Sequence, residues 1–179
     1  SNTATAGVCL PTAGAEEFGD MYFFNLFDNH ADSLSGNYYD PEVAAEIAKI
    51  ADKRTVRMVD HYTALTPVND GFEVGMTYAN YNINVYTKNP QRYIQELAEY
   101  QAAANQNGFE DVTLGAFEIN SGDYTGQIMV VIQAPTAVRL GEFFDAGEEA
   151  WNVAASAKFP KLRKLKRGFL MTCEIVYAR

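Results

Sequence analysis

The sequence predicts an α+β protein in which residues 76–179 form a ferredoxin-like βαββαβ unit, an antiparallel sheet with two helices on one face. Three observations predict this class. Residues 79–87 alternate between apolar and polar side chains, which is the period of a strand with one apolar face. Two segments with helical spacing follow. Apolar strand-like segments lie between these two segments and after the second one. The resulting order β-α-β-β-α-β folds most simply as a split βαβ sheet with right-handed crossovers.

The first strand of this unit is the segment 79–87. Tyr81, Ile83 and Val85 fall on one side of it and are expected to face the helices. The side chains of the other face are polar: Asn80, Asn82, Asn84 and Tyr86.

The two helices of the unit have recognisable start signals. Asn89 is a good N-cap and Pro90 a good first residue for a helix that ends at Asn107-Gly108. The second helical segment begins after Thr136, its expected N-cap, and extends to Trp151.

The remaining strands of the unit are predicted from apolar runs and turn residues. Residues 109–119 and 126–134 are expected to pair with each other, because the segment 120–123 is a hairpin turn sequence. The last strand is predicted over residues 168–177.

The sequence before this unit is divided at residue 16. Residues 1–16 are rich in Ser, Thr, Ala and Gly and are predicted to be a flexible tail. In the N-terminal part, 17–75, a strand is expected over 21–27, a helix from Asp40 to Lys53 and a turn at 69–71. The segment 55–65 fits either a helix or a strand, so this part is either a helical extension or an eroded second ferredoxin-like half.

Composition limits the classes of partner. The chain has 179 residues and a formal net charge of −9, which opposes binding to nucleic acid or to anionic membrane surfaces. Apolar runs long enough to span a bilayer are absent from the sequence. Six basic residues nevertheless lie within ten positions. They form either a solvated segment beside acidic surface or a patch that docks an anion or a protein. They are Lys158, Lys161, Arg163, Lys164, Lys166 and Arg167.

The cysteines are Cys9 and Cys173 alone, which is too few for a zinc site. A disulfide between them would suit an exported protein, and the tail composition leans toward export. The sequence favours instead a buried Cys173 and an unpaired Cys9. The chain lacks the P-loop, GxGxxG, GxSxG and CxxC motifs, and we predict no tightly held cofactor.

The polar face of the 79–87 strand is the predicted ligand site. Its residues are Asn82, Asn84, Tyr86, Gln127 and Thr172, with Glu174 as the candidate catalytic base. Polar side chains on a covered sheet face need water, a ligand or a partner to satisfy them, and a carboxyl in such a pocket would serve as a general base.

A metal site is the alternative at the histidines. His30 and His61 each follow closely on an acid, Asp28 and Asp60, and Asp32 lies nearby in sequence. Imidazole and carboxylate ligands suit zinc or iron, although the spacing matches no metal motif and ordinary surface histidines are expected.

The pattern resembles the dimeric α+β barrel superfamily, which includes antibiotic-biosynthesis-type monooxygenases and NIPSNAP-like proteins. The resemblance lies in the spacing of residues 89–97, Gly108, 115–118, the 122–126 turn and 134–137. It implies two such units, from two chains or from two halves of one chain, whose sheets enclose a cavity. The expected function is therefore small-molecule binding or assembly as a homodimer. The alternatives are a cofactor-independent monooxygenase or isomerase and a structural dimerisation module.

Overall fold

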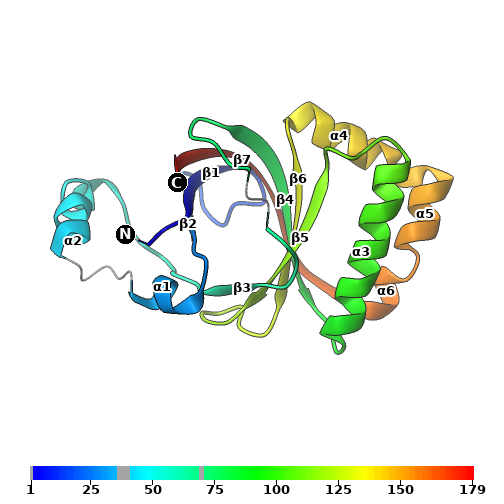
Figure 1. The fold of residues 1–179 in the computed structure, drawn as a ribbon, viewed down its shortest axis with the longest axis horizontal. Helices are drawn as coiled ribbons and strands as arrows, with labels where there is room; N and C mark the ends of the chain where they lie inside the picture. Colours follow the sequence, from blue (N-terminus) through cyan, green and yellow to red (C-terminus); the bar gives the residue numbers. More distant parts are fainter. Residues whose placement is uncertain (1, 36–40, 69–70) are drawn as a thin grey trace.

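A computed structural model of the protein describes residues 2–35, 41–68 and 71–179 (Figure 1). Within this part of the chain, seven antiparallel strands form one sheet in the order β2-β1-β7-β4-β6-β5-β3. The α+β class predicted from the sequence is confirmed. The strands are β1 (Thr5–Ala13), β2 (Tyr22–Leu26), β3 (Tyr62–Ala64), β4 (Thr77–Tyr86), β5 (Thr113–Ile119), β6 (Ile128–Ala134) and β7 (Lys164–Ala178).

The helices fall into two groups on either side of the sheet (Figure 1). Those that follow β4 cover one face, which we call the helical face: α3 (Pro90–Gln106), α4 (Ala137–Asp145), η2 (Ala146–Glu148), α5 (Ala150–Ser156) and α6 (Phe159–Leu162). Those that precede β4 lie on the other side: α1 (His30–Ser35), α2 (Pro41–Ala48) and η1 (Ala51–Lys53). No helix in the described ranges has both the length and the apolar character needed to cross a bilayer.

The sheet curls away from α3–α6, so that its opposite face becomes an inner face (Figure 1). The curl brings the β1–β2 loop against the β5–β6 turn, although these lie toward opposite edges of the sheet. The Tyr124 hydroxyl donates to the Glu16 carboxylate across this junction at 2.9 Å. Tyr22, Phe24, Phe72 and Met76 pack against the buried residues of the inner face, so the chain itself covers this face.

The main apolar core lies between the helical face and α3–α6. Ile83 and Val85 are buried in it, and Tyr81 packs against it, as the alternation of β4 predicts. Both predicted helix starts are confirmed: Asn89 Oδ1 accepts from the Arg92 N–H, and Thr136 Oγ1 accepts from the Arg139 N–H. Aromatic edge-to-face contacts join the helices within the core.

The N-terminal residues predicted to be a tail form β1, which lies inside the sheet between β2 and β7. That prediction is wrong over 5–13, because pairing on both sides orders small residues that have no strong strand pattern of their own. Cys9 faces Cys173 directly across β1 and β7 and forms a disulfide with it. The expectation of an unpaired Cys9 is corrected by the same register.

The rest of the N-terminal part agrees with the sequence in places. The strand expected over 21–27 is β2, and α2 is the helix expected after Asp40, although Asp40 itself lies outside the described residues, as does the 69–70 part of the predicted turn. In the ambiguous 55–65 segment only Tyr62–Ala64 is regular, as a short strand on β5. Helix α1 has no counterpart in the prediction.

Candidate functional site

Three asparagines of β4 are buried on the inner face of the sheet. Asn80, Asn82 and Asn84 have 7%, 5% and 4% of their surface exposed, respectively. They alternate with Tyr81 and Ile83, because successive side chains of a strand point to opposite faces. The strand therefore has the predicted polar face, but the rest of the chain shields this face from solvent.

The amide groups of these asparagines are poorly satisfied. Asn80 Nδ2 donates to Cys173 Sγ at 3.8 Å, and Asn82 Nδ2 donates to Met129 Sδ at 3.4 Å. Sulfur is a weak acceptor, and exchanging the amide oxygen and nitrogen would leave the nitrogen without one. All three Oδ1 atoms lack a hydrogen-bond partner within the described residues, as does Gln127 Oε1.

We call Asn80, Asn82, Asn84 and Gln127 the amide cluster. Gln127 immediately precedes β6 and follows the alternation of Met129, which pairs with Asn84. An unsatisfied buried polar group costs about 1–3 kcal/mol. Four such groups on neighbouring strands therefore lower the stability of the fold at one place. Unsatisfied polar groups of this kind are retained in proteins mainly at functional sites.

The walls around the amide cluster combine apolar and charged groups. Asn82 and Asn84 pair across to Phe169 and Arg167 of β7. The Arg167 guanidinium lies 4.7 Å from the centre of the Phe169 ring and donates to the Tyr22 hydroxyl at 2.8 Å. It also forms an ion pair with Glu16, so its charge is balanced within the fold.

A second polar pair, Asp60 and Tyr62, lies where the chain enters β3. Burial, and after it the charge of Asp123, raises the pKa of the Asp60 carboxyl. Burial, followed by the charge of Asp60, raises the pKa of Tyr62 to about 12. Asp60 Oδ1 is a further buried oxygen for which the described residues supply no partner.

The structure separates the residues that the sequence grouped as a site. Asn82, Asn84 and Gln127 share the inner face. Thr172 and Glu174 pair with Ala79 and Thr77 and therefore lie exposed on the opposite face. Their placement beside the asparagines is wrong, because apolar residues occupy both faces of β7 and concealed its parity.

Tyr86 also lies outside the buried amide cluster. It is the last residue of β4, beyond a register shift between Asn84 and Val85, and 47% of its surface is exposed. The alternation of the strand predicts on which face Tyr86 lies, but it does not predict how far the side chain is buried.

The predicted histidine pair is brought together by the fold. The rings of His30 and His61 lie 5.3 Å apart. Asp32 is engaged by Asn2 and Asn29 at 2.6 and 2.7 Å. Across the described ranges, no group of three His, Cys, Asp or Glu side chains is placed to hold a metal ion.

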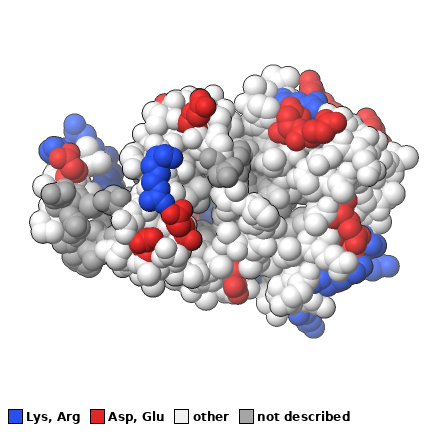
Figure 2. Space-filling model, viewed as in Figure 1, with Lys and Arg blue, Asp and Glu red and all other residues white. Residues whose placement is uncertain are grey.

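The basic segment 158–167 does not form one surface patch. Lys158 pairs with Glu96 and Glu99 on α3, and Arg167 points to the inner face. Figure 2 shows basic side chains over the region of α6 with acidic side chains beside them. The expectation of a segment that pairs with nearby acidic surface therefore describes part of it.

Several residues near the amide cluster or at the entry to β3 were not identified from the sequence. Arg167 was assigned to the basic segment, and Tyr22, Asp60 and Tyr62 lie in the N-terminal part, whose pairing was unknown. For Asn80, the only signal in the sequence was its place in the alternation of residues 79–87, which puts it on the polar face.

No protein-family model and no curated protein matches this chain. The properties of the amide cluster itself carry the functional proposal.

Proposed function

We propose that the chain is a small-molecule-binding protein on a ferredoxin-like scaffold, with its ligand held at the amide cluster on the inner face. The strand order β7-β4-β6-β5 and the placement of α3 and α4–α6 in the two crossovers support such a scaffold. The resemblance to the dimeric α+β barrel superfamily is consistent with a ligand on the sheet face away from the helices.

One observation carries the proposal: four buried amide oxygens on neighbouring strands have no partner in the described part of the chain. Folding alone gains nothing from them, because apolar side chains of similar size would fill the same space without the desolvation cost. A ligand that donates hydrogen bonds to these oxygens would offset that cost.

The chemistry of the cluster defines the class of ligand. The amide groups are neutral and both donate and accept, while Met129, Phe169 and Met171 supply apolar walls. The nearest cation, Arg167, is already neutralised by Glu16. The ligand is accordingly an uncharged molecule that carries several N–H or O–H groups on an apolar frame, such as a small heterocycle.

Binding is preferred over catalysis because the candidate base, Glu174, lies on the other face of the sheet. A homodimer formed to cover the inner face is also unnecessary, since the N-terminal part of the same chain buries it.

A thermal-shift panel tests the proposal. Uracil, adenine and lumichrome are the probes, and a ligand of the native state raises the melting temperature as its concentration rises. At least one uncharged heterocycle should give a shift that Asn84→Leu abolishes and the exposed amide control Gln106→Leu retains. Shifts that survive Asn84→Leu, or no shift with any probe, would contradict the assignment.

A further inference from the structure

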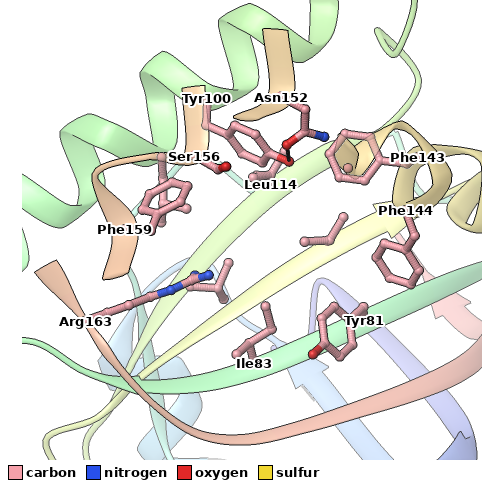
Figure 3. Close-up of a pocket in the computed structure, with 14 residues that line it drawn as sticks. Tyr81, Ile83, Tyr100, Leu114, Phe143, Phe144, Asn152, Ser156, Phe159 and Arg163 are labelled. Carbon is pink, nitrogen blue, oxygen red and sulfur yellow. Dashed lines mark hydrogen bonds between the residues drawn. The ribbon is translucent and has the colours of Figure 1, made fainter. Parts of the chain in front are cut away.

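A second concavity lies on the helical face, between the sheet and the helices that cover it (Figure 3). Its volume is about 230 Å³, and it is partly open to solvent. The floor is formed by residues of β4, β5 and β6, and aromatic side chains of α3, α4 and α6 form the walls. Tyr81, Tyr100, Phe143, Phe144 and Phe159 are the aromatic residues that line it.

Apart from the hydroxyls of Tyr81 and Tyr100, the polar side chains that line this cavity come from one stretch of the chain. Asn152 and Ser156 lie on α5, and Arg163 follows α6 with its guanidinium directed into the cavity (Figure 3). Asn152 Oδ1 accepts the Tyr100 hydroxyl at 2.9 Å, which leaves the amide N–H groups as its free donors. Each of these three side chains carries an N–H or O–H group that can donate a hydrogen bond.

Arg163 differs from most other arginines of the chain. It is half-buried, yet it forms no ion pair with any carboxylate of the residues that the structure describes, a property it shares only with the exposed Arg54. The arginines that do form such pairs are Arg57, Arg92, Arg139, Arg167 and Arg179. In a chain of net charge −9, a half-buried cation without an anionic partner calls for an explanation.

The guanidinium of Arg163 is held in position by two aromatic residues, Tyr93 and Phe159. It donates to the Tyr93 hydroxyl at 2.7 Å and lies 4.8 Å from the centre of the Phe159 ring. The Tyr93 hydroxyl occupies one of the five N–H donors of a guanidinium. The planar fork that remains matches the two oxygens of a carboxylate.

We propose that this cavity binds a small carboxylate with a single aromatic ring, the ring against the aromatic walls and the carboxylate on Arg163. The volume falls below the roughly 300–1,000 Å³ of sites for drug-sized ligands, so one ring fits and a polycyclic molecule does not. Lys161 and Lys164 are exposed and close to Arg163 in sequence, and they add positive potential to this part of the chain. This site lies on the opposite face of the sheet from the amide cluster and does not depend on it.

The test is a titration with benzoate and phenylacetate, using benzyl alcohol as the uncharged analogue. Trp151, the only tryptophan, stacks on Tyr100 with ring centres 6.4 Å apart, so its fluorescence reports on the cavity. Both carboxylates should change this fluorescence saturably and bind at least tenfold more tightly than benzyl alcohol. Their affinity should fall as salt is added, because an ion pair contributes to binding.

Two variants locate the site. Arg163→Gln should weaken carboxylate binding at least tenfold and leave benzyl alcohol binding unchanged, while the exposed control Lys161→Gln should change it less than twofold. Ser156→Leu, which fills the cavity and keeps Arg163, should weaken all three probes, and Asn84→Leu should weaken none. Equal binding of benzoate and benzyl alcohol, or full benzoate affinity in Arg163→Gln and Ser156→Leu, would overturn the proposal.

Discussion

Both faces of the sheet have buried asparagines, but the two faces differ in how these side chains are hydrogen-bonded. Asn152, packed over the helical face, is 4% exposed, and its Oδ1 accepts the Tyr100 hydroxyl. Asn84 on the inner face is equally buried, and its Oδ1 has no partner in the described chain. Residue type and burial are the same, and only the hydrogen bonding differs.

This difference indicates which face serves stability. On the helical face the fully buried Asn152 and Glu96 are both paired, and aromatic rings pack beside Asn152. The inner face carries several buried oxygens whose desolvation is not offset within the chain. A stability cost that is concentrated on one face is consistent with a binding role for that face.

The largest expected effect comes from the core of the helical face. Phe143 is 2% exposed and packs edge-to-face on Phe109 and Tyr100. Phe143→Ala should lower the free energy of unfolding by about 3–5 kcal/mol, measured by urea denaturation, because it opens a cavity among aromatic rings. Phe144→Ala, at a 40% exposed neighbour, should cost clearly less. Equal losses would mean that this core is not tightly packed.

The inner face also carries the disulfide between Cys9 and Cys173. Both sulfurs are buried, and the bond joins residues 164 positions apart, so it restricts the unfolded chain strongly. The Cys9→Ala/Cys173→Ala variant should lose about 2–5 kcal/mol of unfolding free energy. The same loss should follow when the wild-type protein is reduced before denaturation. If the variant were as stable as the oxidised wild type, the disulfide would not contribute to the free energy of unfolding.

The paired asparagine sharpens the comparison between the faces. Asn152→Leu removes the acceptor of the buried Tyr100 hydroxyl and should destabilise the protein by about 1–3 kcal/mol. Tyr100→Phe in the Asn152→Leu background should recover part of that loss, because it removes the orphaned hydroxyl. No loss in the single variant would show that the hydrogen bonds of the helical face do not matter.

The smallest expected effect is a pH dependence at Asp60. Burial raises its pKa in the folded protein, so the native state holds this proton more tightly than the unfolded chain. The unfolding free energy therefore falls as pH rises from the ordinary carboxyl value of 3.8 through the raised native pKa, and the loss persists at neutral pH. Asp60→Asn should gain more stability over wild type at pH 7 than at pH 3 in urea titrations. The exposed control Glu110→Gln should show no such gain.

The sequence predicted the second half of the fold better than the first. The alternation of 79–87 and the caps at Asn89 and Thr136 are local signals, and the structure confirms them. The β1 strand has no comparable pattern, because its small residues are ordered by pairing with β2 and β7. Contacts between distant segments, such as Cys9 with Cys173, cannot be read from local periodicity.

The candidate site was predictable only where one strand defined it. Asn82 and Asn84 follow from the period of two, whereas Glu174 was misplaced because β7 carries apolar side chains on both faces, such as Leu170 and Met171. The burial of the asparagines depends on the curl of the sheet and on the N-terminal part, and these are tertiary features. The cavity near Arg163 depends equally on how three helices meet the sheet.

The free energy of unfolding of Asn84→Leu, measured by urea denaturation without added ligand, tests the central claim most directly. Asn84 makes no side-chain hydrogen bond among the described residues and is 4% exposed. An apolar side chain of similar size should leave the protein as stable as wild type or stabilise it by about 1–3 kcal/mol. A loss of more than about 1 kcal/mol, typical of a satisfied buried group, would show that the amide serves the fold and would contradict the account.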